Sequence, residues 1–142
     1  MATADPALAE YLDAGPAAGD SSLTAWAAGV SPGETEPGGI ASAFSADLSR
    51  LTYSLDTRAI DPQRPIGSFL AGAPGHCEYF ASAMVLGLRL GGVPARVVGG
   101  YLGADQSALG GSQLTVREAR AHLWVEAFLP ESGWTLYDPT PA

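Results

Sequence analysis

An apolar helical run followed at once by a strand constrains the fold of this chain more than any other feature. One buried helix face is predicted by apolar residues that recur every three or four positions, namely Cys77, Phe80, Met84 and Leu88. Gly91-Gly92 ends this helix, and Pro94 prevents its continuation. Ala95 to Leu102 is then predicted to be a buried strand. The pattern therefore pairs a central helix with a sheet.

Two amphipathic helices are predicted upstream of this one. The first has Ser22 as its N-cap and Pro32-Gly33 as its stop, and its apolar face consists of Leu23, Trp26, Ala27 and Val30. The second follows a loop at residues 33–39, and its apolar face consists of Ile40, Phe44, Leu48 and Leu51. A short apolar turn is expected at residues 66–70. Helices thus precede the sheet.

Alternating side chains predict a C-terminal pair of strands. Apolar and other residues alternate from His122 to Leu129, residues 130–133 turn the chain, and Trp134 to Tyr137 form the last strand. Between the first strand and this pair, the sequence predicts a loop at residues 103–112 and a further strand at Gln113–Val116. Helices first and a mostly antiparallel sheet afterwards make the class α+β.

Composition excludes several classes of protein. With 46% hydrophobic and 15% charged residues, the 142-residue chain is globular, and we expect a flexible lead-in at residues 1–21 and one domain at 22–142. A formal charge of −8 with scattered arginines argues against a nucleic-acid or anionic-membrane surface. One cysteine excludes an internal disulfide framework and any site with several thiolate ligands.

Targeting signals are absent from the printed sequence. No apolar stretch reaches the roughly 18 residues of a transmembrane helix, so no direct membrane insertion by this segment is expected. The N-terminus shows no basic region followed by an apolar run. We expect either a cytoplasmic protein or a domain cut from a longer chain.

The single cysteine has the setting of a nucleophile. Cys77 follows the glycine- and proline-containing stretch 72–75 and lies at the predicted start of a helix. Unpaired N–H groups and the helix dipole at that position favour a thiolate and can bind an oxyanion. The alternative is a buried structural cysteine, since cysteine is among the most buried residue types. Its surroundings favour the catalytic interpretation.

A histidine and an aspartate downstream supply the remaining parts of a Cys-His-Asp site. His122 is favoured as the base over His76, because His76 adjoins Cys77 and neighbouring side chains at a helix start diverge by about 100°. His122 also fits a satisfied core histidine, and Asp138 before Pro139 also fits a turn held by its own backbone.

Strand counting leaves a geometric difficulty for Asp138. A regular hairpin with its loop at residues 130–133 pairs Leu129 with Trp134, and therefore Val125 with Asp138. Asp138 would then be three residues out of register with His122 and on the wrong face of the sheet. A bulge, or a bend after Tyr137, would have to return the carboxylate to His122.

The chain resembles the transglutaminase-like domain, within the bacterial transglutaminase-like and cysteine protease superfamily, over about residues 22–142. Four blocks in the right order and spacing carry this resemblance: Gly75 to Ala81, Gly92 to Tyr101, Ala121 to Glu126, and Gly133 to Pro141. It implies a papain-like α+β core whose nucleophile helix packs on the sheet, with Cys77 as nucleophile, His122 as base and Asp138 as orienter. It also implies that the register brings the three together.

Two positions depart from the family pattern. The family often has an acidic residue before its Ala-His and a small residue after the histidine, where this chain has Arg120 and Leu123. Both lie beside the expected cleft, so substrate preference is not carried over. Arg96 and Glu126 are interpreted as structural, paired with each other or with backbone. Two aromatic residues are interpreted as core rather than substrate-stacking, Trp124 and Trp134.

The function predicted is that of a cysteine-dependent acyl-transfer enzyme on a peptide or glutamine amide, with hydrolysis favoured over amine transfer. The alternatives are a non-catalytic binding or scaffolding domain, and a metal site built from His76, Cys77, His122 and Asp138, whose first two ligands converge poorly. The expected partner is a protein or peptide substrate, with no nucleic acid, no cofactor and no metal. The resemblance further implies an extracytoplasmic domain tethered to membrane helices in a longer parent chain.

Overall fold

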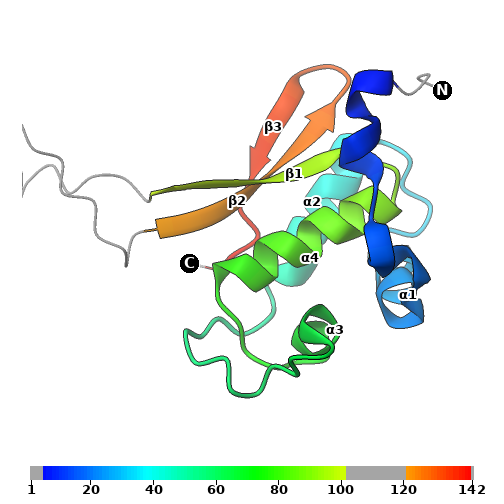
Figure 1. Ribbon diagram of the computed structural model, residues 1–142. Coiled ribbons are helices and arrows are strands. Elements are labelled where there is room, and N and C mark those ends of the chain that lie inside the picture. Colours follow the sequence, from blue (N-terminus) through cyan, green and yellow to red (C-terminus); the bar gives the residue numbers. More distant parts are fainter. Residues whose placement is uncertain (1–4, 102–120, 142) are drawn as a thin grey trace, which may run out of the picture.

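The computed structural model describes residues 5–101 and 121–141, where helices pack against a three-stranded antiparallel sheet (Figure 1). The sheet order is β1-β2-β3, so that β2 is central. The helices are α1 (Ser21–Val30), α2 (Pro37–Leu48), α3 (Pro65–Leu70) and α4 (Cys77–Leu90), and the strands are β1 (Ala95–Tyr101), β2 (Ala121–Leu129) and β3 (Gly133–Tyr137). This order confirms the predicted α+β class.

Helix α4 lies at the centre of the hydrophobic core. It contacts β1 and β2 on one side and α1, α2 and α3 on the others. Phe80, Met84 and Leu88 are fully buried, as the predicted helix face requires, and each stabilises the fold by roughly 1.5–3 kcal/mol. Cys77 in the first turn is only half-buried. The helix is thus anchored through its middle while its first residue stays accessible.

The predicted end of α4 at a glycine pair is confirmed. Gly92 adopts φ +85°, a left-handed conformation that glycine takes without strain. The amide of Val93 then donates to the carbonyl of Leu88 at 2.8 Å, which closes the helix. The chain leaves this turn directly into β1.

The N-cap of α1 is Asp20, so the expectation of Ser22 is wrong by two residues. The Asp20 carboxylate accepts from the backbone N–H groups of Ser22 and Leu23 at 2.9 and 3.3 Å. The Ser22 hydroxyl also donates to it, and together with the two amides this lowers the pKa of Asp20. A carboxylate at a helix start can accept hydrogen bonds from several donors and is favoured by the helix dipole. It is therefore preferred over a neutral hydroxyl as the N-cap.

Helix α2 begins at Pro37, inside the segment for which a loop at residues 33–39 is predicted. Proline suits a first helical turn because its missing N–H has no intrahelical acceptor there and its φ is preset. The helix ends at Leu48, and Leu51 packs against the core from beyond the helix. The predicted apolar periodicity is therefore confirmed, but the helix begins and ends earlier in the chain than predicted.

The N-terminal segment takes defined structure where a poorly ordered lead-in is predicted. Residues 5–20 contain two 3-10 helices, η1 (Pro6–Leu12) and η2 (Gly15–Gly19). Arg89 of α4 donates to the carbonyl of Asp13 at 2.8 Å, and the ring of Tyr11 packs edge-on against Trp134 at 5.0 Å. These contacts hold the segment against the helix and the sheet. The domain boundary at residue 22 stays a prediction.

Some expectations lie outside the described residues. These are the loop at residues 103–112 and the strand at Gln113–Val116, between β1 and β2. Within residues 5–101 and 121–141, no helix is long and apolar enough to cross a membrane.

Replacing Gly87 by alanine should destabilise the protein, although alanine is the better helix former. A Cβ at this position of α4 would lie 2.5 Å from Phe44 Cε1 and 2.9 Å from Trp26 Cζ3. We expect overpacking to cost about 1–3 kcal/mol in the free energy of unfolding, measured by denaturant titration. The matched control is Gly29→Ala in α1, where a Cβ meets nothing within 4 Å. Equal stability of the two variants would contradict this account of the α1–α2–α4 packing.

Candidate active site

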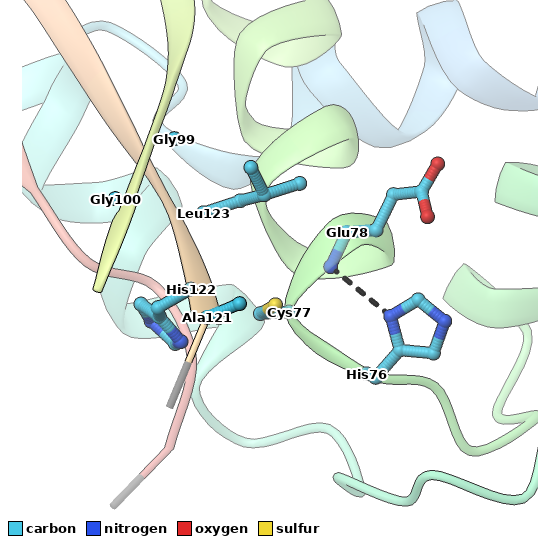
Figure 2. Close-up of a pocket in the computed structure, with 8 residues that line it drawn as sticks. All are labelled: His76, Cys77, Glu78, Gly99, Gly100, Ala121, His122 and Leu123. Atoms are coloured by element: carbon cyan, nitrogen blue, oxygen red, sulfur yellow. Dashed lines mark hydrogen bonds between the residues drawn. The ribbon is translucent and has the colours of Figure 1, made fainter. Parts of the chain in front are cut away.

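An open cavity of about 470 Å³ lies between the first turn of α4 and the neighbouring ends of β1 and β2 (Figure 2). Of the predicted catalytic residues, Cys77 and His122 line it, and Asp138 contacts His122. The lining residues are His76, Cys77, Glu78, Gly99, Gly100, Ala121, His122 and Leu123. The cavity thus joins segments that are distant in the sequence.

The loop that leads into Cys77 is fixed by backbone contacts. The amide of Gly75 donates to the carbonyl of Thr52 at 3.2 Å, and the amide of Ser54 donates to the carbonyl of Gly75 at 2.9 Å. A Cβ on Gly75 would lie 2.9 Å from Phe69 Cδ1, so only glycine lets the chain pass here. These constraints set where Cys77 enters the cavity.

His76 serves as the N-cap of α4. Its Nδ1 accepts from the backbone N–H of Glu78 at 3.4 Å, and its ring packs edge-on against Tyr79 at 4.9 Å. Figure 2 shows His76 and His122 on opposite sides of Cys77, with the Cys77 side chain directed toward β2. The structure therefore gives His76 a capping role. Among the described residues, no group of three or more His, Cys, Asp or Glu side chains is arranged to hold a metal ion.

His122 and Asp138 form a direct contact. His122 Nε2 lies 3.0 and 3.1 Å from the two carboxylate oxygens of Asp138. The imidazole is buried, with 8% of its side chain exposed, whereas the carboxylate is 37% exposed. Because an ionised carboxylate only accepts hydrogen bonds, Nε2 must carry the proton of the neutral imidazole. Among the described residues nothing hydrogen-bonds to Nδ1, whose lone pair can then take a proton.

The turn between β2 and β3 explains how the carboxylate reaches His122. Leu129 pairs with Gly133 and Val125 with Tyr137, so the expected pairing of Val125 with Asp138 is wrong by one residue. The amide of Ser132 donates to the carbonyl of Leu129 at 3.3 Å, and Gly133 follows with φ +74°. This three-residue turn with a left-handed glycine is one residue shorter than the regular hairpin assumed.

The shorter turn changes the face on which Asp138 lies. Extending the observed register by one residue places Asp138 opposite Trp124, two positions from His122 along β2. Because side chains alternate along a strand, Trp124 and His122 share a face. The strand register therefore places the Asp138 carboxylate on the same face of the sheet as His122. Asp138 is the residue directly after β3, which ends at Tyr137.

Arg96 and Glu126 are paired, as expected for structural residues. Their side chains form an ion pair at 2.9 Å across β1 and β2, and this hydrogen bond raises the pKa of Arg96. The guanidinium also lies 3.9 Å from the ring centroid of Trp134. Trp134 is half-buried, as is Trp124, and both pack on aromatic neighbours. Arg96 thus supports the sheet away from the cavity.

Several cavity residues were not singled out as functional in the sequence. Gly99-Gly100 in a strand was the available signal, because glycine inside a strand marks close approach of another group. Glu78 and Ala121 carry no such signal. Leu123, one of the two departures from the family pattern, does line the cavity, and Arg120 lies outside the described residues.

Comparisons with known proteins identify the family of this chain. The sequence model of the transglutaminase-like superfamily matches residues 24–139. A protein-glutamine gamma-glutamyltransferase from Pseudomonas aeruginosa is 47% identical over 66 residues, which is 46% of this chain and 10% of that protein. This chain therefore spans only a small part of that relative.

Solved structures show the same fold. Two crystal structures of the periplasmic domain of TgpA from Pseudomonas aeruginosa match 96% of this chain at 30% identity, with TM-scores of 0.80 and 0.82, over 50% and 48% of their own length. A protein from Cytophaga hutchinsonii named a "putative cysteine protease" matches 96% of this chain and 43% of its own at 18% identity, with a TM-score of 0.69. Because the family model matches residues 24–139, the chain belongs to the transglutaminase-like superfamily.

Proposed function

We propose that this chain is a cysteine-dependent acyl-transfer enzyme that acts on a peptide or glutamine amide. Cys77 is the nucleophile, His122 the general base and acid, and Asp138 the group that orients His122. The observation that carries the proposal is the hydrogen bond between His122 Nε2 and Asp138, made at the cavity that Cys77 lines. It leaves Nδ1 of a buried imidazole available for proton transfer.

The first half-reaction forms a thioester. Nδ1 of His122 takes the thiol proton of Cys77, and the thiolate attacks the amide carbon. The tetrahedral intermediate collapses as the imidazolium returns that proton to the leaving nitrogen, which departs as an amine, or as ammonia from glutamine. The Asp138 carboxylate stabilises the imidazolium throughout and remains ionised.

The start of α4 supplies a donor for the oxyanion of that intermediate. The N–H of Glu78 is taken by the His76 side chain, and the N–H groups of Tyr79 and Phe80 point to the His76 carbonyl. The N–H of Cys77 has no such partner among the described residues and belongs to the same residue as the attacking sulfur. It therefore suits the role of an oxyanion donor.

The second half-reaction resolves the thioester. Water or an amine attacks the acyl carbon, His122 accepts its proton, and Cys77 leaves as the thiolate. We favour water, because the described residues leave the cavity open to solvent and excluding water would need an enclosing tunnel. The product of hydrolysis is a free carboxylic acid.

Amine transfer is the second candidate for this step. The relative that is 47% identical over 66 residues is named a protein-glutamine gamma-glutamyltransferase. In addition, Glu78 is an exposed residue of the cavity lining. Its carboxylate extends away from Cys77 in Figure 2 and can attract a cationic amine only at longer range. Replacing Glu78 therefore helps to distinguish amine transfer from hydrolysis.

We further propose an extracytoplasmic location within a longer, membrane-tethered protein. Two matched crystal structures are of the periplasmic domain of TgpA, of which this chain covers about half. A single-cysteine site without structural disulfides can work in such a compartment. Protein or peptide segments outside the cytoplasm are then the expected substrates.

Removing either reacting side chain should abolish turnover. We expect Cys77→Ala and His122→Ala each to lower kcat by about 10⁴-fold or more, and Asp138→Ala to cost about tenfold to a hundredfold less. His76→Ala should cost activity far less and instead lower the stability of α4 by about 1 kcal/mol, because a cap is lost. The measurements are peptide-amide turnover and thermal unfolding. If His76→Ala proved more damaging to kcat than His122→Ala, the assignment of the base would fail.

Hydrolysis should outrun amine transfer. Incubation with a glutamine peptide and excess labelled cadaverine should yield mostly the free acid, because water reaches an open thioester freely. Mass spectrometry distinguishes the acid from the amine adduct. Predominant amine incorporation that falls in Glu78→Gln would reverse this prediction and would assign Glu78 as the residue that attracts the amine.

A further inference from the structure

Trp124 packs directly on the imidazole of His122. The two ring centroids are 5.2 Å apart with an interplanar angle of 67°, an edge-to-face arrangement. Both residues lie on β2 two positions apart, so their side chains share a face. Asp138 approaches the same imidazole at Nε2. The imidazole therefore has a carboxylate at one nitrogen and an indole against the ring.

The indole is itself held in place by the neighbouring strand. Gly100 of β1 pairs with His122, and a Cβ on Gly100 would lie 2.5 Å from Trp124 Cζ3. The indole thus lies over the β1 backbone at the one point where no side chain intervenes. A glycine at residue 100 and a tryptophan at 124 fit each other as a pair.

We propose that Trp124 is a positioning residue that fixes the imidazole plane of His122 and shields its hydrogen bond to Asp138; this rests on the proposed function. A single hydrogen bond at Nε2 leaves the ring free to rotate about it, and the indole contact removes that freedom. The burial of His122 at 8% exposure, beside a carboxylate that is 37% exposed, fits shielding from the imidazole side. The imidazole, which lines the cavity together with Cys77, is thereby held in one orientation.

The position of the His122 imidazole can be tested by measuring how fast the Cys77 thiol is alkylated. Cys77 is the only cysteine in the chain, so whole-protein mass reports its alkylation by iodoacetamide. At pH 6 the thiol reacts fast only when a nearby imidazole has taken its proton, whereas at pH 9 an ordinary thiol ionises without help. The ratio of the alkylation rates at pH 6 and pH 9 therefore measures how well His122 is placed.

Trp124→Leu should lower this ratio about tenfold or more, the scale on which supporting contacts to a functional histidine act, and Trp124→Phe should restore most of it. The matched control is Trp134→Leu, which removes the same side chain from β3, where it packs on Arg96 and Phe128 instead of His122. The control should keep the parent ratio. An unchanged ratio in Trp124→Leu, or an equal loss in Trp134→Leu, would overturn the proposal.

A second variant covers the case in which Trp124→Leu does not fold. Gly100→Ala adds only a methyl group but must displace the indole, so it should lower the ratio as well. A parent-like ratio in folded Gly100→Ala would then count against the proposal. His122→Ala distinguishes failure of the proposed function from failure of the positioning role of Trp124. If that variant left the ratio unchanged, the proposed function would fail, and this role of Trp124 with it.

Discussion

The turn between β2 and β3 decides whether His122 and Asp138 can meet. Side chains alternate strictly along a strand, so a hairpin longer by one residue would move Asp138 to the opposite face. The three-residue turn at residues 130–132, followed by Gly133 with its positive φ, sets the register that pairs Val125 with Tyr137. This register places Asp138 on the same face as His122, which allows the hydrogen bond between Asp138 and His122 Nε2. The chemistry proposed for Cys77 therefore depends on the conformation of a glycine in a surface turn.

Helix α4 solves the complementary problem of presenting a thiol at a fixed point. Its middle is anchored by full burial of Phe80, Met84 and Leu88, which leaves the first turn at the edge of the core. The capping by His76 and the pinned loop at Gly75 fix the residues on the N-terminal side of Cys77. At the same helix start, the backbone N–H of Cys77 has no hydrogen-bond partner among the described residues. In the proposed mechanism, this helix supplies both the nucleophile and an oxyanion donor, β2 supplies the base, and the residue that follows β3 orients that base.

Sequence patterns predicted most of the elements because their signals are local. The apolar spacing from Cys77 to Leu88, the glycine pair after it and the alternation from His122 to Leu129 each involve neighbours along the chain. The start of α2 was misplaced because proline was interpreted as part of a loop, although it is also favoured in a first helical turn. The cap of α1 was misplaced because a carboxylate and a hydroxyl compete there for the same amides.

The errors that matter for the site concern contacts between distant segments. Counting could not tell a three-residue turn from a four-residue one, because that choice depends on Gly133 adopting a left-handed conformation. Likewise, the contact of Trp124 with His122 over Gly100 needs two strands in register before it can be recognised. Residues 5–20 pack on the rest of the protein through contacts of Tyr11 and Arg89, and no periodic pattern in the sequence predicts these contacts.

The most direct test of this account is the tautomer of His122. Nitrogen-15 NMR of protein labelled in histidine distinguishes an imidazole protonated at Nε2 from one protonated at Nδ1, and His122→Ala assigns the signal. The account predicts that neutral His122 carries its proton on Nε2, donated to Asp138, with Nδ1 unprotonated, and that Asp138→Ala removes this preference. A neutral His122 protonated at Nδ1 would contradict the account, because that nitrogen could not then take the proton of Cys77.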